Sequence, residues 1–125
     1  MDKETKRILV VHPHNAFREA LAMLLEQEDD LEVAWQAGSI TDTHEVHLDG
    51  IDLALVDPLL PDGDGLKLIR EVSVGNPHAL ALVLSHRLDE ALYQQALGAG
   101  AVEVLATNTT LEEVIDAVRR SAGAS

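Results

Sequence analysis

The sequence contains no cysteine and only three aromatic residues, Phe17, Trp35 and Tyr93. The absence of cysteine excludes disulfides and thiolate chemistry, and it fits a reducing compartment. No apolar run approaches the roughly 20 residues that a membrane span needs, and the polar, mixed-charge start does not resemble a signal peptide. We therefore expect an aliphatic core, a cytoplasmic location and no membrane attachment.

Basic residues are also scarce. Nine lysines and arginines stand against 22 aspartates and glutamates, which gives a net charge of −13. Such a surface repels phosphate backbones, so we expect no direct binding of nucleic acid. The 125 residues are close to the usual size of one domain and show no internal linker, so residues 1–125 are predicted to form a single domain.

Short apolar runs alternate with segments of helical spacing along the whole chain. The expected strands lie at residues 8–11, 31–35, 53–56, 79–84 and 102–105. The first helix is expected to begin after Asn15 as its N-cap, and the second is a short helix within 38–50. The third is expected over 66–72, and the fourth over 88–97, ending at Gly98 and Gly100. The last is expected to begin at a capping box formed by Thr110 and Glu113. This alternation predicts an α/β fold, a flavodoxin-like doubly wound parallel sheet of five strands in the order 2-1-3-4-5 with five helices.

Polar side chains follow several of these strands. Asp57 ends the run Leu53–Val56 and precedes a loop rich in proline and glycine. Because ligands bind at the carboxyl edge of such sheets, Asp57 is a candidate nucleophile or cation ligand, and the alternative is a loop carboxylate or a helix cap. The same edge should gather His12-Pro13-His14, Ser85-His86 and Ala106-Thr107 into one crevice.

Residues 6–121 resemble a response-regulator receiver domain, and most closely the receivers that precede a LuxR-type helix-turn-helix. The matching segments are Ile8–Val11, Leu55–Asp57 with Pro61 and Asp64-Gly65, Val83–Ser85, Ala99–Ala101 and Thr110–Glu113. The resemblance implies that Asp57 stands where the family accepts a phosphoryl group from a histidine kinase. It also implies that Ser85 stands where a hydroxyl binds that phosphate.

Four positions depart from the family pattern. His12 and Pro13 occupy the places of the two acidic residues that hold Mg²⁺, Thr107 the place of the phosphate-binding lysine, and Val104 that of the aromatic switch residue. Imidazole is a soft ligand and proline offers none, whereas Mg²⁺ prefers carboxylates and water. We therefore expect no bound Mg²⁺ and an atypical receiver, a pseudo-receiver that is not an enzyme, in which phosphorylation of Asp57 is abolished or very slow.

Three arrangements remain open for the crevice. His12 or His14, protonated, could pair with Asp57 and fill the place of the metal. A zinc site could form from His12, His14, Asp57 and His86. Otherwise the histidines are solvated and share no ligand, and Ser85 could simply cap the next helix.

The resemblance also suggests partners. These are other proteins, a histidine kinase or an effector domain in transcription regulation, and a second copy of the chain. The first helix and the last helix (Leu111, Val114, Ile115, Val118) are the candidate dimer surfaces, unless these apolar residues pack on the sheet. Two alternative functions are a working two-component phospho-acceptor at Asp57 and a module that senses a small ligand or a transition metal on the same fold.

Overall fold

Five parallel strands form the central sheet. The computed structural model describes residues 5–86, 89–106 and 110–122, and within them the strand order is β2-β1-β3-β6-β7. The strands are β1 (Lys6–Val11), β2 (Leu31–Ala37), β3 (Leu53–Val56), β6 (Leu80–Ser85) and β7 (Glu103–Ala106). Counted along the chain this is the predicted order 2-1-3-4-5, so the fold class is confirmed.

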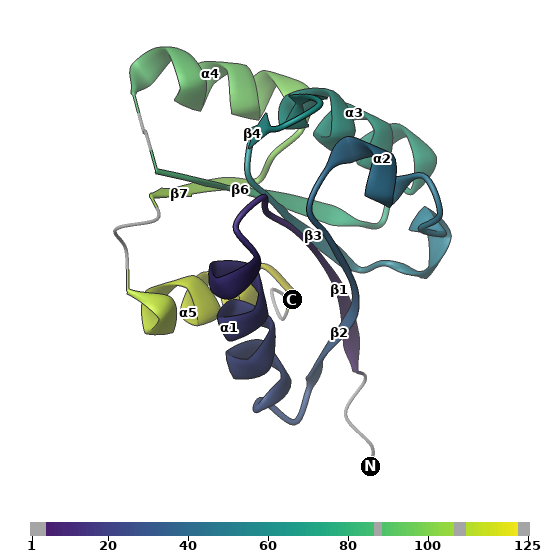
Figure 1. Cartoon of the computed structure of the whole chain (residues 1–125), viewed down its shortest axis with the longest axis vertical. Coiled ribbons are helices and arrows are strands. Elements are labelled where there is room, and N and C mark those ends of the chain that lie inside the picture. Colours follow the sequence, from purple (N-terminus) through teal and green to yellow (C-terminus); the bar gives the residue numbers. More distant parts are fainter. Residues whose placement is uncertain (1–4, 87–88, 107–109, 123–125) are drawn as a thin grey trace.

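Helices cover both faces of the sheet (Figure 1). On one face lie α1 (Asn15–Glu26) and α5 (Leu111–Ala122); on the other lie α2 (Ile40–Thr43), α3 (Gly65–Gly75) and α4 (Glu90–Ala99). Residues 38–50, where a brief helix was expected, form only the single turn α2 and a 3-10 turn, η1 (Leu48–Gly50). A short hairpin, β4 (Leu59–Leu60) with β5 (Gly63–Asp64), was not predicted. In the part of the chain that is described, no helix has both the length and the apolar character to cross a membrane.

The core has two layers, one on each face of the sheet. Leu53 and Leu55 of β3 pack in the layer with α1 and α5, whereas Ala54 and Val56 pack in the layer with α3 and α4. All four residues are buried. A strand covered on both faces needs an unbroken apolar run, which explains why β3 lacks polar alternation.

Helix α5 packs its apolar stripe on the sheet. Val114 and Val118 are buried, and Leu111 and Ile115 are partly buried against the same cluster. Sheet packing therefore accounts for most of the apolar residues that the sequence offered as a dimer surface.

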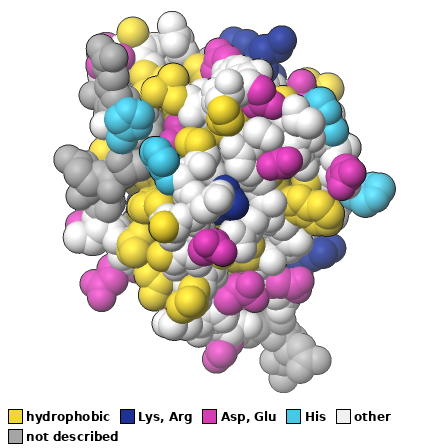
Figure 2. Space-filling view, in the orientation of Figure 1, with side chains coloured by type: hydrophobic (Ala, Val, Ile, Leu, Met, Phe, Trp, Pro, Cys, Tyr) yellow, Lys and Arg dark blue, Asp and Glu magenta, His cyan; other side chains and the backbone are white. Residues whose placement is uncertain are grey.

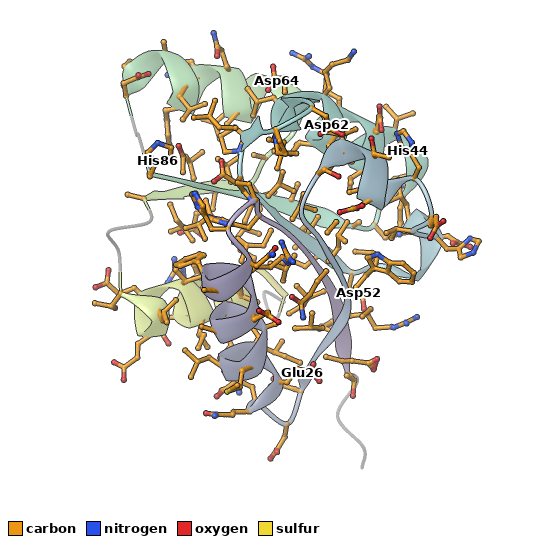
Figure 3. All side chains as sticks on the ribbon, viewed as in Figure 1. Glu26, His44, Asp52, Asp62, Asp64 and His86 are labelled. Carbon is orange, nitrogen blue, oxygen red and sulfur yellow. The ribbon has the colours of Figure 1, made fainter. Side chains whose placement is uncertain are left out.

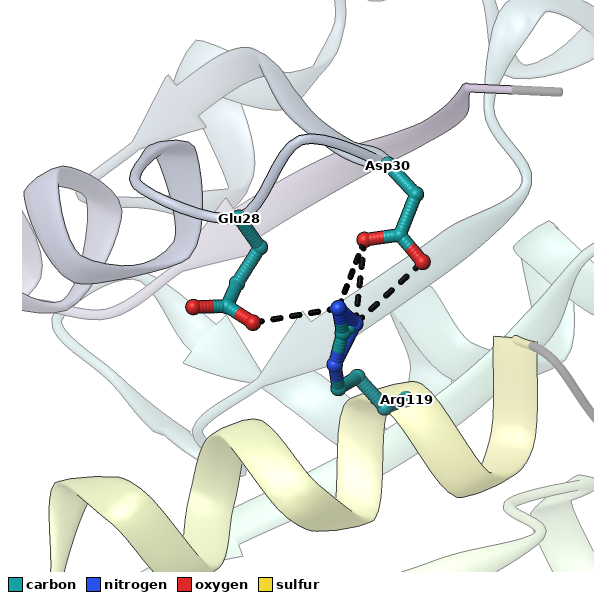
Figure 4. A network of polar contacts seen from close by, with 3 residues as sticks. All are labelled: Glu28, Asp30 and Arg119. Carbon is teal, nitrogen blue, oxygen red and sulfur yellow. Dashed lines mark hydrogen bonds and ion pairs between the residues drawn. The ribbon is translucent and has the colours of Figure 1, made fainter. Parts of the chain in front are cut away.

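An ion-pair network ties the C-terminal part of α5 to the turn between α1 and β2 (Figure 4). Both terminal nitrogens of Arg119 lie 3.0 Å from Asp30 Oδ1, and Nη2 lies 3.1 Å from Glu28 Oε1. These side chains are about one-third exposed, so solvent weakens each pair. The network joins parts of the chain that are far apart in sequence.

Two local expectations were wrong. The N-cap of α1 is His14, without a side-chain cap bond, and Asn15 is already the first helical residue. In the sequence, Leu31, Val33 and Trp35 alternate with polar or small residues, which predicts a half-exposed strand. This simple alternation fails in β2, because the pairing shifts so that Val33 faces Ile8 while Trp35 faces Leu9. The shift skips Ala34 and leaves Trp35 42% exposed.

Two other local predictions are confirmed. Thr110 Oγ1 accepts a hydrogen bond from the amide of Glu113 at 3.2 Å, as a capping box requires. Gly100 ends α4 with a φ of 113°, a left-handed conformation that favours glycine.

Candidate functional site at the carboxyl edge of the sheet

Three buried polar side chains meet the carboxyl edge of the sheet. Asp57 follows β3, His12 follows β1, and Ser85 ends β6; each is at most 4% exposed. Strand β3 lies between the other two strands, because β1 and β6 both pair with it. The parallel register therefore places Asp57 centrally, as the sequence predicted.

His12 lies directly against Asp57. Its Nε2 is 3.3 Å from Asp57 Oδ2, and the other carboxylate oxygen, Oδ1, accepts a hydrogen bond from the backbone N–H of Leu59 at 2.8 Å. The backbone N–H of Asp57 donates to Val11 O at 2.9 Å. The carboxylate is thus held between an imidazole and the first residue of the hairpin.

The second ring nitrogen fixes the tautomer of His12. The backbone N–H of His14 donates to His12 Nδ1 at 3.1 Å, and a backbone amide can only donate. Nδ1 therefore carries no proton, and the single proton of the neutral ring sits on Nε2, facing Asp57. A second proton on the ring would sit on Nδ1 and break the hydrogen bond from the backbone N–H of His14.

Burial also opposes a charge on His12. It lowers the pKa of His12 below 6.5; Asp57 partly offsets this effect, and nearby His14, Arg18 and His86 reinforce it. Of the arrangements left open above, the contact of His12 with Asp57 is present, and the lowered pKa favours the neutral ring over the protonated one. The pair is therefore a neutral imidazole whose Nε2 contacts the Asp57 carboxylate at 3.3 Å.

Arg18, which sequence reasoning missed, supports this arrangement from α1. Its Nη1 donates to the carbonyl oxygen of His12 at 2.7 Å, and its Nε donates to Gln36 Oε1 at 3.3 Å. The ring of Phe17 packs against that of His12, with centroids 4.6 Å apart. The only signal in the sequence was that Arg18 is the one basic residue of its helix.

The loop after Asp57 is held by its own acidic residues. The carboxylate of Asp62 accepts bonds from the amides of Ile40 and Thr41, at 2.8 and 2.9 Å, and from the Thr41 hydroxyl. These donors, the Ile40 amide foremost, lower the pKa of Asp62 to about 2. Asp64 caps α3 by accepting from the Leu66 amide at 2.9 Å. Both residues are labelled apart from His86 in Figure 3, and these contacts of their carboxylates lie within the loop and the adjoining helices.

Ser85 does not cap α4. The N-cap of that helix is Asp89, whose Oδ1 accepts from the amide of Leu92 at 2.8 Å. Ser85 instead lies in register with Ala106 at the end of β6. Val104 is partly buried against the layer of α3 and α4, and Thr107 lies outside the described residues.

The comparisons with known proteins agree with this geometry. The family model for the response regulator receiver domain matches residues 8–119. The chain belongs to this family.

The receiver resembles regulators of the VraR and LuxR type. It is 27% identical to the response regulator protein VraR of Staphylococcus aureus, over 94% of this chain and 56% of the relative. The signal receiver domain of the putative response regulator NarL from Mycobacterium tuberculosis is 28% identical, with a TM-score of 0.86 and coverage of 98% and 99%. A Burkholderia pseudomallei response regulator, solved with a phosphorylated aspartic acid, calcium ion and citrate, is 27% identical, with a TM-score of 0.80 and coverage of 94% and 69%. The chain spans little more than half the length of the VraR relatives.

The groups around Asp57 do not suit the Mg²⁺ that the family implies. One oxygen of the Asp57 carboxylate faces His12 Nε2, while the other accepts from the Leu59 amide. The neighbouring Pro13 has no side-chain ligand, and Mg²⁺ needs a near-octahedral shell of hard oxygens. Among the described residues, no three His, Asp or Glu side chains gather into a group able to hold a metal ion. His12, His14, Asp57 and His86 therefore do not form the zinc set considered above.

A cleft lies beside this site, between the hairpin and α4. Its volume is about 470 Å³, and Leu59, Ser85 and Leu92 are among the residues that line it. On the face of the molecule shown in Figure 2, acidic side chains outnumber basic ones, in line with the net charge of −13. The cleft is thus an opening next to Asp57 on an acidic protein.

Proposed function

We propose that this receiver domain is a pseudo-receiver, which signals through protein–protein contacts and in which Mg²⁺-dependent phosphorylation of Asp57 is abolished or very slow. The observation that carries the proposal is the 3.3 Å contact between His12 Nε2 and Asp57 Oδ2. The imidazole takes up one carboxylate oxygen that a metal would need. It also brings no positive charge of its own.

Charge explains the expected loss of reactivity. Phosphoryl transfer depends on cations that neutralise the phosphoryl oxygens and align the attack. Here the acidic pair is replaced by His12 and Pro13, and Thr107 stands at the lysine position. Removing one preorganised stabilising group often lowers the rate by a factor on the order of 10²–10³. Here both the acidic pair that holds the metal and the lysine are missing.

Acetyl phosphate labelling with and without Mg²⁺, read on a phosphate-affinity gel, tests the proposal. The wild type is expected to give no Mg²⁺-dependent shifted band. The triple variant His12→Asp, Pro13→Asp, Thr107→Lys restores the family groups, and it is expected to gain a band that disappears when Asp57→Asn is added. A stoichiometric band from the wild type that is lost in Asp57→Asn would refute the proposal.

The working phospho-acceptor is the second candidate. It is favoured by the position of Asp57 at the end of β3 beside buried Ser85 on β6, and by the phosphorylated aspartic acid of the Burkholderia relative. The same gel decides between the two candidates.

The partners proposed for the domain are a histidine kinase or an effector domain involved in transcription, together with a second copy of the chain. The proposed location is the cytoplasm. Size-exclusion chromatography with light scattering tests the homodimer.

A further inference from the structure

His12 joins the start of α1 to Asp57 through both of its ring nitrogens. Nε2 lies 3.3 Å from Asp57 Oδ2, and Nδ1 accepts the backbone N–H of His14 at 3.1 Å. The residue is 4% exposed, and its ring packs against that of Phe17 with centroids 4.6 Å apart. Because the ring is buried and both nitrogens are engaged, it cannot take up a proton without losing one of these contacts.

The contact on the Nδ1 side leads directly into α1. Pro13 has no backbone N–H, so His14 carries the first amide donor after His12 itself. His14 is the N-cap of α1, its side chain makes no cap bond, and its carbonyl accepts the backbone N–H of Arg18 at 2.9 Å. A change at the His14 amide is therefore passed to the first turn of the helix.

In the described part of the chain, four charged or titratable groups act on the His12 ring. They are Asp57 after β3, His14 and Arg18 at the start of α1, and His86 after β6. Burial lowers the pKa of His12 below 6.5; Asp57 opposes this effect, and the three basic groups add to it. Arg18 Nη1 also donates to the carbonyl of His12 at 2.7 Å, which anchors residue 12 and leaves the displacement to His14.

We infer that these contacts form an acid-sensitive switch, in which one proton taken up at His12 Nδ1 releases the backbone N–H of His14 and with it the first turn of α1. The proton goes to Nδ1 because Nε2 already carries one. Two N–H donors then face each other, and the contact with His14 is lost. On the other side of the ring, the new imidazolium is attracted more strongly to the Asp57 carboxylate. The neutral ring thus holds the helix, and the charged ring holds Asp57.

The hairpin is attached to the same carboxylate. The backbone N–H of Leu59 donates to Asp57 Oδ1 at 2.8 Å, so a stronger pull on Oδ2 also alters the surroundings of that bond. A fall in pH therefore acts on α1 and on the hairpin together, without a phosphoryl group. The inference does not rest on the loss of phosphorylation, because it uses only contacts of the unphosphorylated chain.

Nuclear magnetic resonance of the ¹⁵N-labelled chain from pH ~7.5 to ~5, a range that spans the usual histidine pKa, tests the inference. The ring nitrogens of His12 and the amide of His14 are expected to change with one common midpoint, below 6.5 and above about 5. One pH unit below that midpoint the change should be about 90% complete, since one unit is a factor of ten in protonation. The amide of Leu59 should follow with the same midpoint.

Two variants assign the transition to His12. His12→Gln removes the titrating ring, and it should leave the amides of residue 14 and Leu59 unchanged over this range. His14→Gln is the matched control, because it removes a neighbouring imidazole but keeps the backbone N–H. The transition should persist in this control at a higher pH, since His14 opposes a charge on His12. If His12→Gln does not fold, the common midpoint of ring and amide in the wild type still decides.

Four results would overturn the inference. These are a His14 amide that stays fixed while His12 titrates, an amide transition that survives His12→Gln, a His12 midpoint outside the expected range, or the loss of all dispersed signals together. The last result would mean global unfolding in place of a local switch. The acetyl phosphate assay is read at neutral pH, so its failure and the failure of this inference are distinguishable.

Discussion

Acidification should destabilise the folded domain through His12. In the unfolded chain this imidazole has a pKa of about 6.5, whereas burial lowers its pKa in the fold. Below about pH 6.5 the unfolded chain therefore takes up a proton that the folded chain does not accept. As the pH is lowered, the free energy of unfolding decreases between the pKa of His12 in the unfolded chain and its pKa in the fold. Below the folded pKa it levels off. This is the opposite sign to a histidine that gains its charge on folding.

The size of the effect follows from one proton. Each pH unit in that window costs up to about 1.4 kcal/mol, so at pH ~5.5 the loss attributable to His12 is at most about 1.4 kcal/mol. The matched control is His12→Gln, because its amide keeps a polar donor at this position but does not titrate. Every other titrating group of the wild type is present in the variant.

Urea unfolding at steps between pH ~7.5 and ~5 measures this difference. The wild type is expected to lose more stability than His12→Gln as the pH falls, and long-range ¹H–¹⁵N spectra at pH 7 are expected to show the proton of His12 on Nε2. The reasoning is refuted if both proteins have the same pH dependence, or if the wild type becomes more stable than the variant on acidification. The second result would mean that Asp57 holds His12 in its charged form.

Two further predictions use matched pairs of variants and thermal or urea unfolding. A Cβ at Gly65 would lie 2.5 Å from the backbone oxygen of Asp57, so Gly65→Ala should destabilise the fold by about 1–3 kcal/mol. Gly98 lies on α4 with open space around the position of a Cβ, so Gly98→Ala should stabilise the fold by about 0.5–1 kcal/mol. Equal effects of the two substitutions would contradict the packing described. Arg119→Met should lower the free energy of unfolding by about 1 kcal/mol. Arg120→Met should lower it by less than about 0.5 kcal/mol, because the arginine of the Arg120–Glu103 pair is more exposed. The reverse order would show that the Arg119 network is not stabilising.

Much of the architecture could be predicted because it depends on patterns that repeat along the chain. The continuous apolar run of β3 requires cover on both faces, and the alternation with helices then fixes the strand order. Parallel strands bring their carboxyl ends to one edge, so His12, Asp57 and Ser85 could be placed together from sequence alone.

The features that the sequence left open or misplaced are set by local details of the backbone. The charge of His12 depends on its burial and on the backbone N–H of His14, neither of which leaves a mark in the sequence. Capping of the next helix by Ser85 was an open alternative, and Asp89 caps α4 because the helix begins only at Glu90. The register shift at Ala34 depends on how β2 pairs with β1. The alternating pattern of residues 31–36 therefore assigned Trp35 to the wrong face of the strand.

The Arg119 network has a consequence for the folding kinetics. Its partner Asp30 is 89 positions away in sequence, so the contact requires the last helix and the first third of the chain to be docked together. Contacts of such long range carry a high loop-closure cost and are expected to form late, after the rate-limiting barrier. Interactions that are absent from the transition state slow unfolding and leave refolding nearly unchanged. The Arg119 network is therefore expected to lengthen the lifetime of the folded receiver without speeding its formation.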